Sequence, residues 1–176
     1  MCGGRGTRLD TDTEKPLYRV GGEPMIDRVL AAVQESRVET VYAVGSPHTS
    51  GTREHVTVPW IEAPGEGYVA DLQYALDRVE QPVLTLAADL PLLDGEIVNR
   101  VLDAHGGGSL SVVAPAALKR QLGVSADTVF GEEPELAPTG VNVVGEGGED
   151  SYLSYDARVA VNVNHSTDAP VAEALL

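Results

Sequence analysis

The chain has 176 residues and a formal net charge of −15, with 27 Asp and Glu against 12 Lys and Arg. This length suits a single domain over residues 1–176, and a hydrophobic fraction of 43% excludes wholesale disorder. The acidity argues against a nucleic-acid partner, because duplex phosphates require a basic face. The single cysteine excludes an intramolecular disulfide, and no apolar run approaches the ~20 residues of an integral membrane segment. We therefore expect a cytoplasmic protein.

The kind of acidity is also informative. Ten of the 12 basic residues are Arg, and Val and Leu far outnumber Ile. One hypothesis is a haloarchaeal cytoplasm of molar salt, where the Debye length falls to ~3 Å and like charges scarcely repel. The alternative is an ordinary acidic protein from a GC-rich genome.

The first half of the chain alternates helical and strand patterns, which predicts βα units and an α/β fold with a parallel sheet. Pro59 favours a sheet edge for the strand that contains it, because proline lacks a backbone N–H. The predicted elements are a helix opened by Pro24 with an apolar stripe from Met25 to Val33, a strand at 40–45, a weaker strand at 57–61, and a helix from Val69 to Val79.

The second half contains the most apolar strand, Val83 to Ala88, which we expect in the centre of the sheet. The elements expected after it are a helix capped by Asp94 with a face from Ile97 to Leu102, a strand at 109–114, a short helix at 115–122, an acidic loop at 131–138, strands at 140–144 and 159–163, and a terminal helix that starts near 166–170.

A glycine-rich loop opens the chain, and its three glycines are Gly3, Gly4 and Gly6. Glycine permits backbone angles that other residues resist, so successive N–H groups can form a nest for phosphate oxygens. Positive charge gathers beside this loop, at Arg5, Arg8 and Lys15. A plain loop is the alternative for the glycines alone, but the Glu-Lys-Pro-Leu segment at 14–17 strengthens the phosphate-binding interpretation.

These residues carry a resemblance. The pattern G-G-x-G-T-R, followed by E-K-P-L and G-G-x-P-M-I, resembles the N-terminal signature of the MobA-like and sugar-nucleotide nucleotidyltransferase superfamily. Further segments, at 65–72, 88–90, 138–144 and 161–164, resemble archaeal adenosylcobinamide-phosphate guanylyltransferases. The resemblance implies a Rossmann-like, three-layer α/β fold with a mainly parallel mixed sheet. Relatives place a strand before the glycine loop, so we also expect that this first strand is missing from the given N-terminus.

The resemblance implies a reaction as well. In that family the phosphate of adenosylcobinamide phosphate attacks the α-phosphorus of GTP, which gives adenosylcobinamide-GDP and pyrophosphate. This nucleophile is already an anion at neutral pH, so the reaction needs positioning and charge neutralisation more than a general base. GTP and adenosylcobinamide phosphate are the expected partners, and a homodimer stays an open alternative to a monomer.

The catalytic and metal residues follow from this assignment. The backbone from Gly3 to Thr7 is expected to hold the β- and γ-phosphates, and Arg8 and Lys15 the charge of the pyrophosphate and α-phosphate. Asp89 follows the apolar strand at its carboxyl end, where α/β sheets bind ligands, and its hard carboxylate suits Mg²⁺. Asn164 is expected to complete the metal site, as the matching position does in the superfamily. A turn-capping role is the alternative for both side chains.

Other residues match nucleotide-binding positions of the family. Gly65, Gly67, Tyr68 and Asp71 match a loop-to-helix segment of the nucleotide pocket, although Glu66 stands where the family pattern has Lys. Ser46 begins a Ser-Pro-His segment that forms either part of the guanine pocket or a surface turn. Gly140 and Asn142 match a position near the nucleotide phosphate and the acceptor, and a strand bulge is the alternative for Gly140.

Two other functions stay open at this point. One is another nucleotidyltransferase, such as a molybdenum-cofactor guanylyltransferase or a sugar-phosphate nucleotidyltransferase. The second is a non-catalytic nucleotide-binding protein of the same fold.

Overall fold

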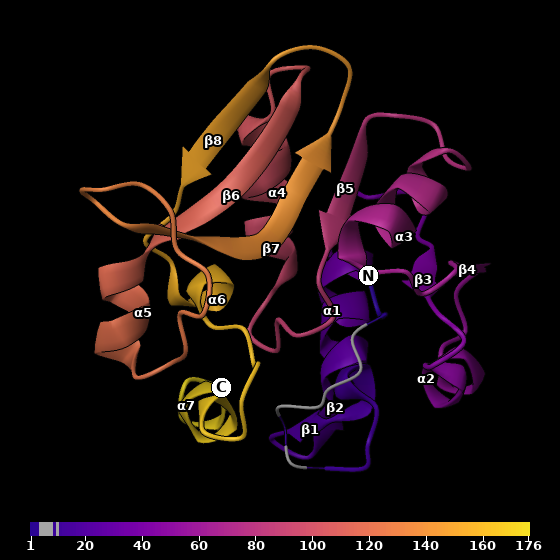
Figure 1. Cartoon of the computed structure of the whole chain (residues 1–176), viewed down its shortest axis with the longest axis horizontal. Coiled ribbons are helices and arrows are strands. Elements are labelled where there is room, and N and C mark those ends of the chain that lie inside the picture. The colour runs from indigo at the N-terminus through magenta and orange to yellow at the C-terminus, as the bar shows by residue number, and fades with distance from the viewer. Residues whose placement is uncertain (4–8, 10) are drawn as a thin grey trace.

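The structure is a computed structural model that describes residues 1–3, 9 and 11–176 (Figure 1). Its elements in chain order are the 3-10 turn η1 (Lys15–Leu17), β1 (Arg19–Val20), β2 (Glu23–Pro24), α1 (Met25–Gln34), β3 (Ala43–Gly45), α2 (Ser50–His55), β4 (Trp60–Glu62), α3 (Tyr68–Leu76), β5 (Val83–Leu86), α4 (Gly95–Ala104), β6 (Ser109–Pro115), α5 (Ala116–Leu122), β7 (Leu136–Val144), β8 (Glu149–Leu153), α6 (Ala157–Ala160) and α7 (Asp168–Ala174). None of the helices in these residues is long and apolar enough to cross a membrane.

The strands form a mixed arrangement. One sheet has the order β5-β7-β6-β8, in which β7 runs antiparallel to both neighbours and β8 runs parallel to β6. β3 and β4 form a parallel pair, and β1 and β2 a short antiparallel pair. The expected mixed sheet of an α/β fold is confirmed, with β7 as the strand that reverses direction.

Met1 and Cys2 connect β3 to β5. The Met1 amino group donates to the Leu86 carbonyl at 2.7 Å, and the Ala88 N–H donates to the Met1 carbonyl at 3.2 Å. On the other side, the Cys2 N–H donates to the Val44 carbonyl at 2.6 Å. An apolar cavity of about 790 Å³ lies beside these two residues, between the two sheet edges. The expectation of a missing first strand stays a prediction.

Helices cover both faces of the sheet. Ala43 and Val44 are neighbours on β3, so their side chains point to opposite faces. Ala43 packs in one cluster with Ile26 of α1, whereas Val44 packs in another with Ala75 of α3. The strands therefore lie between two helical layers, which confirms the expected three-layer fold.

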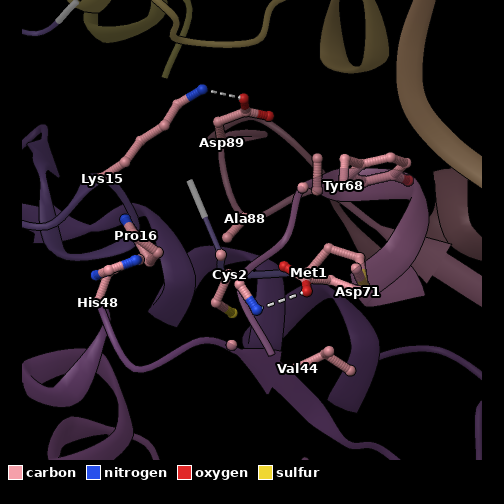
Figure 2. A pocket seen from close by; sticks show the side chains of 15 residues that line it. Met1, Cys2, Lys15, Pro16, Val44, His48, Tyr68, Asp71, Ala88 and Asp89 are labelled. Carbon is pink, nitrogen blue, oxygen red and sulfur yellow. Dashed lines mark hydrogen bonds and ion pairs between the residues drawn. The ribbon is translucent and has the colours of Figure 1, made fainter. Parts of the chain in front are cut away.

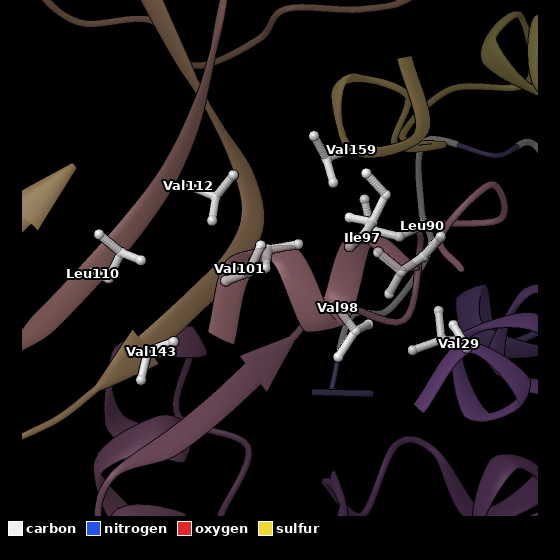
Figure 3. Packing of buried hydrophobic residues seen from close by; sticks show 12 residues of the cluster. Val29, Leu90, Ile97, Val98, Val101, Leu110, Val112, Val143 and Val159 are labelled. Atoms are coloured by element: carbon white, nitrogen blue, oxygen red, sulfur yellow. The ribbon is translucent and has the colours of Figure 1, made fainter. Parts of the chain in front are cut away.

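α4 supplies much of the central core. Asp94 caps this helix as predicted, because its carboxylate accepts a hydrogen bond from the Ile97 N–H at 2.9 Å. Ile97, Val98 and Val101 are almost fully buried against the sheet (Figure 3). Each such buried side chain contributes roughly 1.5–3 kcal/mol of transfer free energy. This packing holds the end of β5, and the segment that follows it, in place.

Most predicted elements are found where the sequence places them. The helices at α1, α3, α4, α5 and α7 are confirmed, and the strands predicted at 40–45 and 57–61 appear as β3 and β4. β8 was not predicted, because its sequence from Glu149 to Leu153 is mostly polar and acidic. β7 begins at Leu136, so the acidic loop expected at 131–138 is shorter than predicted.

The prediction of a strand at 159–163 is wrong. Asp156 accepts a hydrogen bond from the Arg158 N–H at 3.0 Å, and this cap starts α6, which ends at Ala160. The alternating valines Val159, Val161 and Val163 are fully buried, so the apolar spacing reflects burial in two clusters rather than pairing in a ladder. The backbone after α6 nevertheless reaches the end of β5.

Candidate active site

Three residues predicted from the sequence meet at one ammonium group. Lys15 Nζ lies 2.5 Å from Asp89 Oδ2 and 2.8 Å from Asn164 Oδ1. The side chains of Lys15 and Asp89 are only 18% and 12% exposed, so water screens this pair weakly. Figure 2 shows the Lys15 side chain extending to Asp89 beside the pocket.

Glu14 fixes the turn that presents Lys15. Its carboxylate accepts hydrogen bonds from the Gly51 N–H at 2.8 Å, the Thr52 N–H at 2.7 Å and the Thr52 hydroxyl at 2.6 Å. Partial burial alone would raise the pKa of Glu14, but these donors stabilise the ionised form and hold the pKa below its ordinary value. Glu14 therefore ties the start of η1 to the first turn of α2.

Asp89 is held at the carboxyl end of β5. Its backbone carbonyl accepts a hydrogen bond from the Val163 N–H at 2.9 Å, which brings the segment of Asn164 to the same sheet edge. Asp89 Oδ1 is buried and has no hydrogen-bond partner among the residues that the structure describes. An unpaired buried carboxylate oxygen is costly, so this atom is available to a ligand.

A cavity of about 360 Å³ opens beside this cluster, between η1, the start of α3 and the ends of β3 and β5. Lys15 and Asp89 lie at its border. The predicted nucleotide-binding residues that line it are Gly3, Gly65, Gly67, Tyr68 and Asp71. His48, of the predicted Ser-Pro-His segment, lines it as well.

Asp71 organises the loop on one side of this cavity. Its Oδ1 accepts hydrogen bonds from the Gly65 N–H at 2.8 Å and the Glu66 N–H at 3.3 Å. Gly65 has φ of 79°, a conformation that favours glycine. A Cβ on Gly3 would lie 3.4 Å from Asp71 Oδ2, so the start of the glycine loop reaches the same carboxylate. The contacts of Asp71 therefore shape the loop itself.

Tyr68 begins α3 at the rim of the cavity and is 51% exposed. Desolvation of its hydroxyl raises its pKa, and the negative charge of Asp89 acts in the same direction, while a hydrogen bond with Thr85 opposes the shift. The phenol therefore stays neutral and able to donate a hydrogen bond at neutral pH.

Four predicted residues in the described part of the chain do not line this cavity. One of them, Asn164, is joined to its border through the hydrogen bond from Lys15. Ser46 is buried in a turn, where its carbonyl accepts a hydrogen bond from the Thr49 hydroxyl at 2.9 Å. Gly140 has φ of 82°, and a Cβ there would lie 2.8 Å from Ala87 Cβ, so this glycine allows β7 to pass close to β5. Asn142 lies on β7 opposite Thr85. The remaining predicted residues, Gly4, Arg5, Gly6, Thr7 and Arg8, lie outside the described residues.

Two buried charged residues near Asn164 were not predicted. Lys119 is 3% exposed on α5, and Asp168 is 1% exposed at the start of α7. The available signals were a lysine within the apolar part of a helix and a carboxylate four residues after Asn164. Both patterns are common at surfaces, so only the fold shows that they are buried here.

Comparisons with known proteins identify the family of the chain. A family model described as MobA-like NTP transferase domain matches residues 1–140. The chain belongs to this family. As a MobA-like domain it is a nucleotidyltransferase. Lys15 and Asp89 border its cavity, and Asn164 contacts Lys15.

Relatives of this MobA-like domain differ in how much of their own length the match covers. It is 28% identical over 191 residues to adenosylcobinamide-phosphate guanylyltransferase of Methanocaldococcus jannaschii. This match covers 100% of the chain and 95% of that protein. The chain is 31% identical over 150 residues to the bifunctional protein GlmU of Neisseria gonorrhoeae, which covers 79% of the chain. The chain corresponds to only 33% of the length of GlmU.

A solved structure shows the same fold. The crystal structure of a putative glucose-1-phosphate thymidylyltransferase from Bacillus anthracis, in complex with a sucrose, has a TM-score of 0.69 to this chain. The match covers 99% of this chain and 92% of that one at 12% sequence identity. At this identity the likeness concerns the fold alone.

Proposed function

We propose that the protein transfers the guanylyl group of GTP to adenosylcobinamide phosphate. The observation that carries this proposal is that Asp89 and Asn164 both contact the Lys15 ammonium, with Lys15 and Asp89 at the border of the cavity. The choice of acceptor is supported by the M. jannaschii relative, which matches over the whole chain, whereas the match to GlmU covers a third of that protein.

In this reaction an oxygen of the acceptor phosphate forms a bond to the α-phosphorus of GTP. The bond between the α-phosphorus and the bridging oxygen breaks, and pyrophosphate leaves. Lys15 would stabilise the negative charge that develops around the α-phosphate, and Arg8 the charge of the pyrophosphate. The backbone of residues 3–7 would bind the β- and γ-phosphates. No residue is needed as a general base, because the attacking phosphate is already ionised.

The residues present fit a magnesium ion. Mg²⁺ prefers oxygen ligands and binds through one or two carboxylates together with substrate phosphates. Asp89 Oδ1 is a buried oxygen with no partner among the described residues. Asn164 Oδ1 and Asp89 Oδ2 both accept hydrogen bonds from the Lys15 ammonium, so the three oxygens lie close together. No group of three His, Cys, Asp or Glu gathers as a metal site in the described part of the chain, so substrate oxygens would complete the coordination. When bound, the ion would neutralise phosphate charge.

The cavity of about 360 Å³ would hold the nucleoside. Its wall is formed by the loop that Asp71 organises, by Tyr68 and by His48. These residues offer a neutral phenol and backbone groups as hydrogen-bonding partners for a base. Guanine as that base is supported by the relative of M. jannaschii.

The test is a panel of nucleotides and acceptors in which pyrophosphate release is measured with Mg²⁺ at high KCl. The proposal predicts release from GTP only with adenosylcobinamide phosphate. Release with a sugar 1-phosphate or with molybdopterin instead would assign the chain to another nucleotidyltransferase, and binding of GTP without turnover would indicate a non-catalytic protein. The same panel without KCl tests the saline hypothesis, which predicts loss of activity.

A further inference from the structure

Two buried charges of opposite sign lie under the segment that carries Asn164. Lys119 and Asp168 are 3% and 1% exposed, and neither reaches the cavity. Burying a charge costs several kcal/mol, and well-packed apolar residues often serve stability equally well. Stability alone therefore does not account for these two side chains, and their contacts show another use.

Lys119 holds the start of the segment. Its ammonium donates to the Ala160 carbonyl at 2.6 Å and to Asn162 Oδ1 at 2.5 Å. The first contact fixes the end of α6, and the second fixes a side chain two residues before Asn164. Both contacts are charge-assisted, and such hydrogen bonds are stronger than neutral ones.

Asp168 holds the end of the segment. Its Oδ2 accepts hydrogen bonds from the backbone N–H groups of Asn164 and His165, each at 2.9 Å. The Ser125 N–H and hydroxyl each donate to the same carboxylate at 2.8 Å. Four donors satisfy the buried charge, and two of them belong to the backbone that orients Asn164.

The middle of the segment is fixed independently. Val161 and Val163 are fully buried, and the Val163 N–H donates to the Asp89 carbonyl at 2.9 Å. The short stretch from Ala160 to His165 is thus held at three successive points. Asn164 Oδ1, at the end of this stretch, then lies 2.8 Å from Lys15 Nζ.

We propose that Lys119 and Asp168 are positioning residues that clamp residues 160–165 and thereby hold the Asn164 amide oxygen at the transfer site. Loss of either clamp allows the Asn164 side chain to move away from Lys15. The effect on catalysis rests on the proposed function, but the effect on the surroundings of Lys15 does not.

The sequence offers a direct probe of that position, because Lys15 and Lys119 are the only lysines in the chain. Protein labelled with ¹³C at lysine Cε gives two lysine resonances, and Lys119→Met identifies the resonance of Lys15. Asn164→Ala defines how this resonance moves when the amide oxygen is lost. The proposal predicts that Lys119→Met and Asp168→Asn both move it in that same direction.

This comparison separates displacement from a simple change of charge. Lys119→Met removes a positive charge and Asp168→Asn a negative one, so a purely electrostatic effect would move the Lys15 resonance in opposite directions. Val112→Ala, a core truncation on β6, controls for lost stability and should leave the resonance in place. Opposite shifts, or shifts no larger than that of Val112→Ala, would overturn the proposal. If Asp168→Asn does not fold, a Lys119→Met shift matching that of Asn164→Ala supports the clamp, and an unchanged resonance overturns it.

Kinetics provide a second measurement. A small misplacement of a positioned group can cost ~10²-fold in rate, so we expect Lys119→Met to lower kcat/KM by ~10-fold or more. In the Asn164→Ala background the same change should have little further effect, since residues that act through one another are not additive. Equal factors in both backgrounds would contradict the clamp. Absence of turnover by the wild-type protein would count against the proposed function and leave the resonance experiment to decide the clamp.

Discussion

Lys15 Nζ lies 2.8 Å from Asn164 Oδ1, although 149 positions separate the two residues in the sequence. The same ammonium lies 2.5 Å from Asp89 Oδ2, so the beginning, middle and end of the chain contribute to one cluster. Each side chain has its own support, namely the α2 contacts of Glu14, the end of β5 and the clamp of residues 160–165. Disturbing any one support is expected to affect the shared site.

Removal of the Lys15 ammonium should affect turnover far more than folding. We expect Lys15→Ala to lower kcat by ~10²-fold or more, as for the loss of one preorganised charge contact. Steady-state kinetics with GTP and the acceptor measure this effect. Arg19→Ala is the matched control, because Arg19 is a nearby cation whose contact is with the Gly22 carbonyl. A comparable loss of kcat in both variants would contradict a specific role for Lys15.

Asp89→Asn keeps the size of the side chain but removes its charge. We expect a large fall in Mg²⁺-supported turnover together with a higher Mg²⁺ concentration at half-maximal rate, because a neutral amide is a weaker ligand for a hard cation. Titration of activity with Mg²⁺ measures both quantities, with the exposed Asp103→Asn as the control. Unchanged turnover at the same Mg²⁺ concentration would show that Asp89 is not a metal ligand.

Glu14→Gln should lower stability in a pH-dependent way. The amide cannot satisfy the donors of Gly51 and Thr52 as a carboxylate does, so we expect a loss of about 1 kcal/mol at neutral pH. The pKa of Glu14 is lowered in the folded protein, so its stabilising contribution is complete above the ordinary value of 4.5 and disappears as the pH falls through the folded pKa. Urea unfolding from pH 7 to acid should show the two proteins converging, whereas Glu135→Gln, at an exposed ion pair, should follow the wild type throughout. A constant difference at every pH would argue against the ionised Glu14.

Lys119 should give the opposite kind of pH dependence. Burial lowers its pKa in the folded protein, although the charges of Asp168, Asp89 and Asp127 oppose this shift. Between that lowered pKa and the ordinary 10.5 the unfolded chain binds more protons, so the free energy of unfolding contributed by Lys119 rises with pH. The difference between wild type and Lys119→Met in urea unfolding at alkaline pH should therefore grow in favour of the wild type. A difference that does not change with pH would contradict a pKa of Lys119 that burial lowers in the folded protein.

The site could be predicted from the sequence where local chemistry determined it. Lys15 belongs to a recognisable motif, and Asp89 lies just after the apolar strand β5, at its carboxyl end as expected. Asn164 lies beside Lys15, although the expectation that it ends a strand is wrong. The predicted strand before it is a turn of helix and an extended segment, because the Asp156 cap favours a helix that the valine spacing does not reveal.

Other features depend on packing between distant segments and could not be read from the sequence. Ser46 belongs to a turn that Thr49 closes, which removes it from the cavity wall. Lys119 on α5 and Asp168 at the start of α7 look like surface residues in the sequence, but the fold buries both. β8 has a polar sequence and forms a strand because its backbone pairs with β6. This backbone pairing tolerates almost any side chain at an exposed sheet edge.

In the proposed reaction the protein transfers the α-phosphoryl group of GTP, with its guanosine, to adenosylcobinamide phosphate. The most direct measurement uses GTP labelled with ³²P at either the α- or the γ-position, and follows the label by chromatography of the products. We expect the α-label to appear in a cobinamide product and the γ-label in pyrophosphate, and both signals to be lost in Lys15→Ala. Label retained in GTP with this acceptor, or γ-label in the cobinamide product, would contradict the proposed reaction.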